Sequence, residues 1–235
     1  MSCVMALGAP ALAADPGYYL VTAYDNQGQW NIDYRYWTVK NKGSNEVVWP
    51  EIGLGYGVTS RWYTEVYASF IGSSTFATRR SSFNWQNDYL LTQGQYDVDV
   101  ALHTNLFHGY GPFGKPAFEF GPVLQTEVGR LQLNGNLIFD RPLGPARAST
   151  QLKYQWQVKY RWKPELHFGL QGFGELGDWN HWDSSKNQSH RVGPMLSGAF
   201  SVGATQSFKY ELAYLKGSIY GQRGHMFTTR LQYVF

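Results

Sequence analysis

The stretch His225–Phe235, HMFTTRLQYVF, alternates with a period of two and ends on an aromatic residue. On a strand, one face would carry Phe227, Thr229, Leu231, Tyr233 and Phe235, and the other Thr228, Arg230 and Gln232. The terminus of a soluble domain usually frays into solvent and does not need such a pattern. A membrane barrel does, because its outward face meets lipid, its inward face meets a polar lumen, and the last strand pairs with the first to remove both sheet edges.

Two more segments show the same alternation. The first sets Trp30, Ile32, Tyr34 and Tyr36 against Gln29, Asn31, Asp33 and Arg35. The second sets Leu152, Tyr154, Trp156, Val158, Tyr160 and Trp162 against Lys153, Gln155, Gln157, Lys159 and Arg161. Strict alternation of this length would cross the hydrocarbon region as a tilted strand, with aromatics at the interfaces.

The rest of the chain divides into further strand-like segments. They are expected at Val47–Val58, Trp62–Ile71, Trp85–Thr92, Gln95–Phe107, Ala117–Thr126, Leu131–Phe139, Glu165–Leu176, Arg191–Val202, Lys209–Lys216 and His225–Phe235. With the two segments above, the sequence predicts an all-β fold, a closed antiparallel transmembrane β-barrel of about twelve strands.

The connections between these segments alternate in character. The longer or turn-rich links are Lys40–Asn45, Gly72–Asn84, His108–Pro116, Asp140–Thr150, Gly177–His190 and Gly217–Gly224. The short links are Thr59–Arg61, Gln93–Gly94, Glu127–Arg130, Lys163–Pro164 and Gly203–Ser207. A barrel with both termini in the periplasm shows this pattern of outer loops and periplasmic turns.

The final strand also resembles a known class. Its aromatic and apolar positions Phe227, Leu231, Tyr233 and Phe235 resemble the assembly signal of Gram-negative outer-membrane β-barrels. The resemblance implies the bacterial outer membrane as location. It also implies outer-membrane lipid, lipopolysaccharide and the barrel assembly machinery as partners. It is a resemblance to a class of proteins and assigns no single activity.

Composition agrees with a barrel wall. Aromatics make up 17% of the 235 residues, and 26 residues are glycine, while mean hydropathy is only −0.39, as expected when half of each strand is polar. The net charge of +3 is small and the basic residues form no stripe, which argues against a nucleic-acid partner.

The N-terminal residues 1–13 read as the end of a secretory signal peptide, with Ala11 and Ala13 before a cleavage point at Ala14. The basic region that normally opens such a peptide is missing, so we expect the true start to lie upstream. The barrel domain is then 14–235. Cys3 is the single cysteine and would leave with the peptide, which excludes disulfides and thiol catalysis in the mature chain.

Charged residues on the inward faces are the candidate functional groups. The expected lumen or solute-binding residues are Asp33, Arg35, Glu65, Asp97, Asp99, Lys153, Lys159 and Arg161. If their opposite charges pair across the bore, they plug the barrel. If they line separate walls around water, they give the transverse field of a selective pore.

The predicted function is a narrow channel or binding barrel for small polar or charged solutes, with no cofactor, metal or catalytic residue. One alternative is a plugged structural or adhesive barrel that acts through its surface loops. Another is an outer-membrane lipid hydrolase, for which the Ser-His candidates are His103, His108, Ser73 and Ser74. The densest group of candidate metal ligands is Asp178, His181, Asp183 and His190, whose spacing is not diagnostic of a site.

Overall fold

The computed structural model describes residues 18–23, 27–111, 114–144, 149–219 and 221–235, with Ile219 described by its backbone alone. The expected signal peptide, residues 1–13, lies outside the described residues. None of the described residues belongs to a helix long and apolar enough to cross a membrane.

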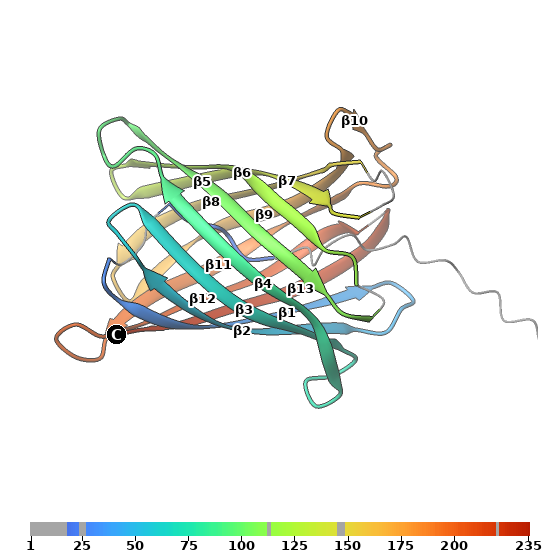
Figure 1. The fold of residues 1–235 in the computed structure, drawn as a ribbon, viewed down its shortest axis with the longest axis horizontal. Helices are drawn as coiled ribbons and strands as arrows, with labels where there is room; N and C mark the ends of the chain where they lie inside the picture. The colour runs from blue at the N-terminus through green and yellow to red at the C-terminus, as the bar shows by residue number, and fades with distance from the viewer. Residues whose placement is uncertain (1–17, 24–26, 112–113, 145–148, 220) are drawn as a thin grey trace, which may run out of the picture.

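The described chain forms one sheet of thirteen antiparallel strands (Figure 1). The strands are β1 (Trp30–Asn41), β2 (Val47–Gly57), β3 (Trp62–Gly72), β4 (Thr78–Leu90), β5 (Val98–Gly109), β6 (Ala117–Val128), β7 (Leu131–Pro142), β8 (Gln151–Lys163), β9 (Leu166–Asp178), β10 (His181–Trp182), β11 (Ser189–Ser201), β12 (Ser207–Ile219) and β13 (Gln222–Val234). Strand β10 is a two-residue extension that pairs with β9. Within the described residues, the other twelve strands close the barrel, because β9 pairs with both β8 and β11.

The last strand pairs with the first, as predicted. Strand β13 runs antiparallel to β1, with Val234 opposite Asn31. The terminal Phe235 continues this pairing, because its backbone N–H and C=O both bond to Trp30 at 2.9 Å. The barrel therefore has no unpaired edge at its seam.

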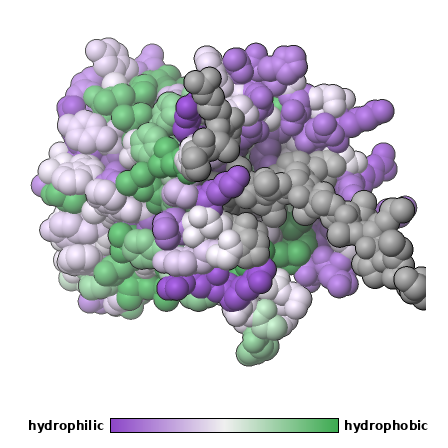
Figure 2. Space-filling model, turned by 45° about the vertical axis from the view of Figure 1, so that its right-hand side comes forward, coloured by the Kyte–Doolittle hydropathy of each residue, from purple (hydrophilic) through white to green (hydrophobic). Residues whose placement is uncertain are grey.

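Alternation along each strand separates an apolar exterior from a polar interior. On β1, Ile32 is 44% exposed, whereas its neighbour Asp33 is 1% exposed and faces the lumen. Figure 2 shows apolar side chains in green across the barrel wall and hydrophilic ones in purple gathered toward one end. An apolar wall around a polar interior suits a barrel set in hydrocarbon.

The two ends of the barrel differ. The end that carries Phe235 has the connections 58–61, 91–97, 129–130, 164–165 and 202–206, and we call it the turn end. The opposite end carries the connections 42–46, 73–77, 110–116, 143–150 and 179–188, and we call it the loop end. The predicted alternation of longer and shorter connections is therefore present in part. The 91–97 connection at the turn end is longer than predicted, and the connection between β12 and β13 is shorter.

Several strand boundaries differ from the prediction. Strand β4 begins at Thr78, not Trp85, so the expected loop Gly72–Asn84 shrinks to 73–77. The polar run at 79–82 hides the alternation, although its pairing with β3 continues through an irregularity between Ser69 and Phe70. Strand β12 likewise continues to Ile219, so the expected long link at Gly217–Gly224 is short.

Strand β5 also starts later than predicted, at Val98 instead of Gln95. Gly94 adopts a left-handed conformation, with φ 70°, and the Gln93 backbone N–H donates to the Gln95 side chain at 2.5 Å. Residues 95–97, which the sequence assigned to the strand, therefore belong to the turn.

Candidate functional site

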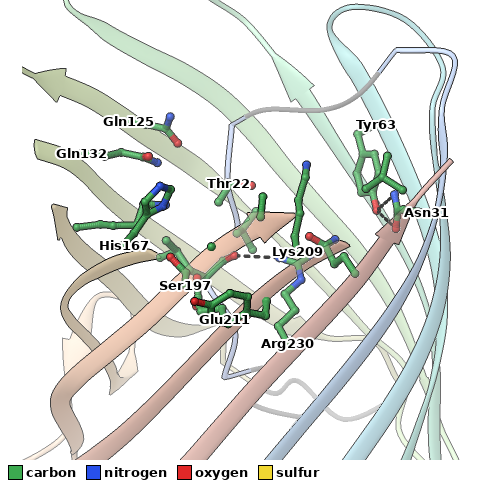
Figure 3. A pocket seen from close by; sticks show the side chains of 18 of the residues that line it. Thr22, Asn31, Tyr63, Gln125, Gln132, His167, Ser197, Lys209, Glu211 and Arg230 are labelled. Atoms are coloured by element: carbon green, nitrogen blue, oxygen red, sulfur yellow. Dashed lines mark hydrogen bonds between the residues drawn. The ribbon is translucent and has the colours of Figure 1, made fainter. Parts of the chain in front are cut away.

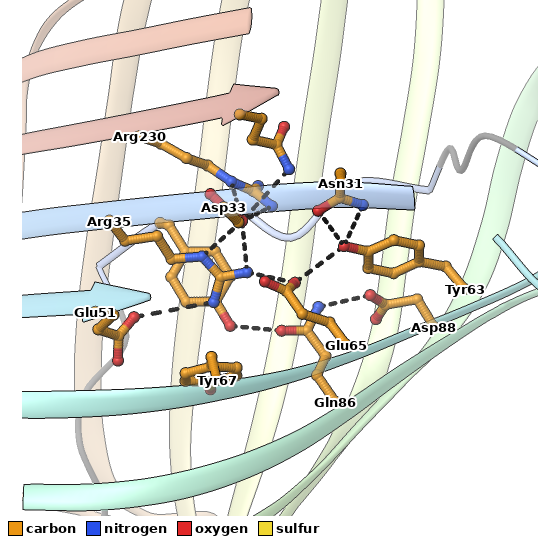
Figure 4. A network of polar contacts seen from close by, with 12 residues as sticks. Asn31, Asp33, Arg35, Glu51, Tyr63, Glu65, Tyr67, Gln86, Asp88 and Arg230 are labelled. Atoms are coloured by element: carbon orange, nitrogen blue, oxygen red, sulfur yellow. Dashed lines mark hydrogen bonds and ion pairs between the residues drawn. The ribbon is translucent and has the colours of Figure 1, made fainter. Parts of the chain in front are cut away.

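Inward side chains of β1, β2, β3 and β13 form an ionic cluster on the lumen wall, the Arg35 cluster (Figure 4). Arg35 donates from Nε to Asp33 at 2.9 Å and from Nη2 to Glu65 at 2.6 Å. Its Nη1 lies 3.9 Å from Glu51 Oε2, and Arg230 Nη2 lies 2.7 Å from Asp33 Oδ2. Two guanidinium groups therefore face three carboxylates, which compensates most of the charge on this wall.

A second ionic cluster lies on β5, β6, β7 and β8. Lys153 Nζ lies 2.8 Å from Glu119 Oε1 and 2.9 Å from Asp140 Oδ2. Asn105 also donates to Glu119, at 3.0 Å. Lys153 is thus held between two carboxylates, and its charge is neutralised by ion pairs within the barrel wall.

The described residues Tyr18–Ala23 lie inside the barrel, and we call them the inner segment. The Tyr18 hydroxyl donates to Glu175 at 2.6 Å. Its ring packs edge-on against Trp37 and Phe173, with centroids 6.2 and 5.8 Å apart. Apolar and polar wall residues together therefore hold the start of this segment in the lumen.

The middle of the inner segment is held by polar wall groups. The Tyr19 hydroxyl donates to Gln86 at 2.7 Å, and the Arg35 guanidinium carbon lies 3.7 Å from the Tyr19 ring centroid. The Val21 backbone N–H donates to Gln155 at 3.1 Å. Two more bonds reach backbone carbonyls of the segment, from Asn136 to Val21 at 2.9 Å and from Arg230 to Leu20 at 3.5 Å. The segment thus satisfies its backbone with wall side chains.

Cavities lie on both sides of the inner segment. The larger one, about 280 Å³, lies toward the turn end, and we call it the turn-end chamber (Figure 3). The acidic, basic and histidine residues among its described lining groups are Asp88, Lys159, His167, Lys209, Glu211 and Arg230. The smaller one, about 30 Å³, lies toward the loop end beside Tyr18, Glu119 and Lys153. Val21 borders both cavities, so the inner segment separates them.

Most of the predicted lumen residues face the interior. Asp33, Arg35 and Glu65 belong to the Arg35 cluster, and Lys153 forms the second cluster. Lys159 lines the turn-end chamber. Asp99 is buried near the turn end and accepts a bond from the Gly94 backbone N–H at 2.8 Å.

Two predicted lumen residues lie elsewhere. Asp97 is exposed in the 91–97 turn, because β5 begins after it, so its predicted inward position on a strand is wrong. Arg161 lies near the end of β8, where its side chain is 35% exposed and pairs with Glu127 at 2.7 Å. Arg161 therefore belongs to the turn-end rim rather than to the interior.

Several lumen groups were not selected from the sequence. Arg230 and Lys209 sit on the polar faces of alternating strands, and extending the alternation rule to β12 would have found Lys209. Asp88 lies in β4, whose alternation is partly hidden. The inner segment has no sequence signal of its own, because six residues without alternation read as an ordinary connection.

The groups considered for a lipid hydrolase are not assembled. His103 is buried in the barrel with Nδ1 2.6 Å from Asp88, whereas His108 is exposed on the opposite face of β5. Ser73 and Ser74 are exposed in the connection between β3 and β4. Across the described ranges, no hydrogen bond joins either serine to either histidine. Nor do three or more of the described His, Cys, Asp and Glu residues gather into a possible metal site, the 178–190 group included.

Comparison with known proteins identifies the fold. No protein-family model matches the chain, and no curated protein matches it in sequence. Among solved structures, the KdgM porin is 9% identical with a TM-score of 0.58, covering 87% of this chain and 99% of the porin. The KdgM porin has also been solved in complex with disordered oligogalacturonate, with a TM-score of 0.59.

Two further solved barrels are comparably similar. The NanC porin is 12% identical with a TM-score of 0.59, covering 85% of this chain and 98% of the porin. The COG4313 outer membrane channel from Pseudomonas putida F1 is 12% identical with a TM-score of 0.57, covering 94% of this chain and 98% of the channel. At such low identity these likenesses establish the fold alone, a closed antiparallel β-barrel similar to those of the outer-membrane porins above.

Proposed function

We propose that this protein is a narrow outer-membrane channel for small polar or charged solutes, closed by its inner segment in the conformation of the structure. The observation that carries this proposal is a polar, charged lumen that contains a chamber of about 280 Å³, lined on one side by the inner segment. A purely structural barrel would have no need of such a chamber. A wall of about twelve strands also leaves less room than that of general porins, so passage should be selective.

The inner segment is suited to closing the bore because its binding energy is balanced. Full burial of Leu20 or Val21 contributes about 2 kcal/mol each, and both are at most 3% exposed. Ordering the backbone costs about 1–2 kcal/mol for each residue. Burial of these two side chains, about 4 kcal/mol together, is less than the cost of ordering six residues, about 6–12 kcal/mol. The burial of Tyr18 and Tyr19, the hydrogen bonds and the arginine contact to Tyr19 therefore decide whether the segment stays in place.

The barrel's surroundings follow from the same proposal. The apolar exterior would contact outer-membrane lipid and lipopolysaccharide. The barrel assembly machinery would insert the chain and read its terminal residues Phe227, Leu231, Tyr233 and Phe235. The turn end would face the periplasm and the loop end the outside. Solute would then cross between the two cavities that the inner segment now separates.

Single-channel recording tests this proposal. The full chain is refolded, its closed barrel is verified by heat-modifiable gel migration, and its conductance is measured in planar bilayers. We expect rare, brief openings from the wild type. Tyr19→Ala removes a buried ring and its hydroxyl bond, worth about 2 kcal/mol, and should raise the open fraction roughly thirtyfold.

The matched control is Tyr96→Ala, which removes a ring that is 72% exposed in the 91–97 turn. It should leave the open fraction unchanged. A folded barrel that stays silent both as wild type and as Tyr19→Ala would contradict the channel and favour a plugged structural protein.

A further inference from the structure

We propose that the turn-end chamber is a binding site for a small organic or inorganic anion that carries carboxylate or phosphate groups. This inference rests on the proposed function, because it names the class of solute that the channel would hold. The residues that line the chamber carry cationic and neutral hydrogen-bond donors that have no partner among the described residues. Its volume of about 280 Å³ fits a small molecule rather than a polymer.

Two lysines supply the charge. Lys159 on β8 and Lys209 on β12 both line the chamber and are only partly exposed (Figure 3 labels Lys209). Neither ammonium group has an ion-pair or hydrogen-bond partner among the described residues, whereas Lys153 is held between two carboxylates. A partly desolvated ammonium without a partner favours an anion strongly, since charges interact more strongly inside a protein than in bulk water.

Two neutral donors point to the same kind of ligand. Gln125 and Ser197 both line the chamber. The Gln125 Nε2 group and the Ser197 hydroxyl are buried and have no hydrogen-bond partner among the described residues. Gln125 is 1% exposed and Ser197 is 6% exposed. Buried donors are normally satisfied. Two donors without partners, on residues that line the same chamber as two ammonium groups, therefore fit a ligand rich in acceptor oxygens.

The other charges in the chamber do not cancel this preference. Arg230 is engaged by Asp33, and Asp88 is engaged by His103 and Gln86. Glu211 remains as the opposing carboxylate, and it acts electrostatically on Lys159 without forming an ion pair with it. Two free cations therefore stand against one carboxylate.

Equilibrium binding to the refolded full-length barrel in detergent tests the site directly. The probes are succinate and inorganic phosphate, and the neutral analogue of succinate is succinamide. Calorimetry should show succinate or phosphate binding that weakens as NaCl is raised, and no binding of succinamide. Lys159→Gln with Lys209→Gln should lower the affinity at least about tenfold, and Glu211→Gln should raise it, because each changes the chamber charge in the opposite direction.

The control pair is Lys115→Gln with Lys163→Gln, which removes the same charge from exposed positions and should leave binding unchanged. If the double chamber variant fails to fold, the Glu211→Gln and single Lys209→Gln variants carry the test. Equal binding of succinate and succinamide, no binding of either anion, or unchanged affinity in the chamber variants would overturn the site.

The channel and the anion site can fail separately. Anion binding by a barrel that never conducts would retain the site and reject the channel. Conductance without anion binding, and with a preference for cations, would retain the channel and reject the site.

Discussion

The carbon of the Arg35 guanidinium group lies 3.7 Å from the ring centroid of Tyr19, so Arg35 contacts the inner segment as well as the barrel wall. The same group bonds Asp33 and Glu65 on the barrel wall. Tyr19 is thereby positioned over a cation that the wall needs for its own stability. The wall cluster and the closed state of the lumen are consequently coupled through Arg35.

Replacing Arg35 should destabilise the barrel as well as release the inner segment. Arg35→Met leaves Asp33, Glu51 and Glu65 without their central cation, at a cost of roughly 3 kcal/mol. Urea unfolding, followed by heat-modifiable migration, should show the loss. Adding Glu65→Gln should recover part of it. Arg130→Met, at an exposed position, is the control. Full stability in Arg35→Met would mean that the cluster does not support the wall.

Tethering the inner segment should abolish any conductance. The Val21 backbone N–H donates to Gln155 Oε1 at 3.1 Å. Cysteines introduced at Val21 and Gln155, in a Cys3→Ser background, can therefore be joined by a short bis-methanethiosulfonate, which forms a disulfide with each thiol and releases two sulfinate groups. We expect the linked barrel to be silent and reduction to restore the openings. Cysteines at the exposed positions Tyr96 and Phe76 serve as the reagent control. Undiminished conductance after complete linkage would show that solute bypasses the segment.

Lys159 and Arg161 should differ in their effect on ion selectivity, although they share one strand face. Lys159 is unpaired in the chamber, whereas Arg161 pairs with Glu127 at the partly exposed rim. Reversal potentials in a KCl gradient should shift toward cation preference in Lys159→Gln and change little in Arg161→Gln. Equal shifts would place the selective field at the rim. Unchanged selectivity with a large loss of stability in Lys159→Gln would indicate a structural role.

The terminal aromatic residue should matter more for assembly in cells than for the stability of the finished barrel. Phe235 closes the seam through its backbone, which any residue can do, and its ring is 42% exposed beside Tyr233. Phe235→Ala should lower the amount of folded protein in the outer membrane severalfold and change urea stability by less than about 1 kcal/mol. Phe76→Ala, in an exposed loop, is the control. Normal outer-membrane levels of Phe235→Ala would reject its role as an assembly signal.

The sequence predicted the barrel wall well because a period of two is a local property. Residues 30–36 show which side chains face inward without any knowledge of neighbouring strands, and the observed burial of Asp33 and Arg35 follows this parity. The same rule was wrong at Asp97, which lies in the turn before β5 begins. It also missed the start of β4 at Thr78, because the residues that follow are polar on both faces of the strand. Boundaries of this kind depend on hydrogen bonds to the adjacent strand, which local alternation does not encode.

The sequence by itself determined the class of fold, the antiparallel order, the pairing of the last strand with the first and the inward orientation of six of the eight charges selected from it. The tertiary structure alone decided which charges neutralise one another and which stay free. Arg35, Glu65 and Arg230 come from separate strands, and closure of the barrel brings them together. It also decided that Tyr18–Ala23 occupies the lumen, because that placement depends on bonds to residues as distant as Gln155 and Glu175. Whether a side chain points inward depends only on its odd or even position along its own strand. Which inward side chains meet one another depends on the hydrogen-bonding register of all the strands that lie between them.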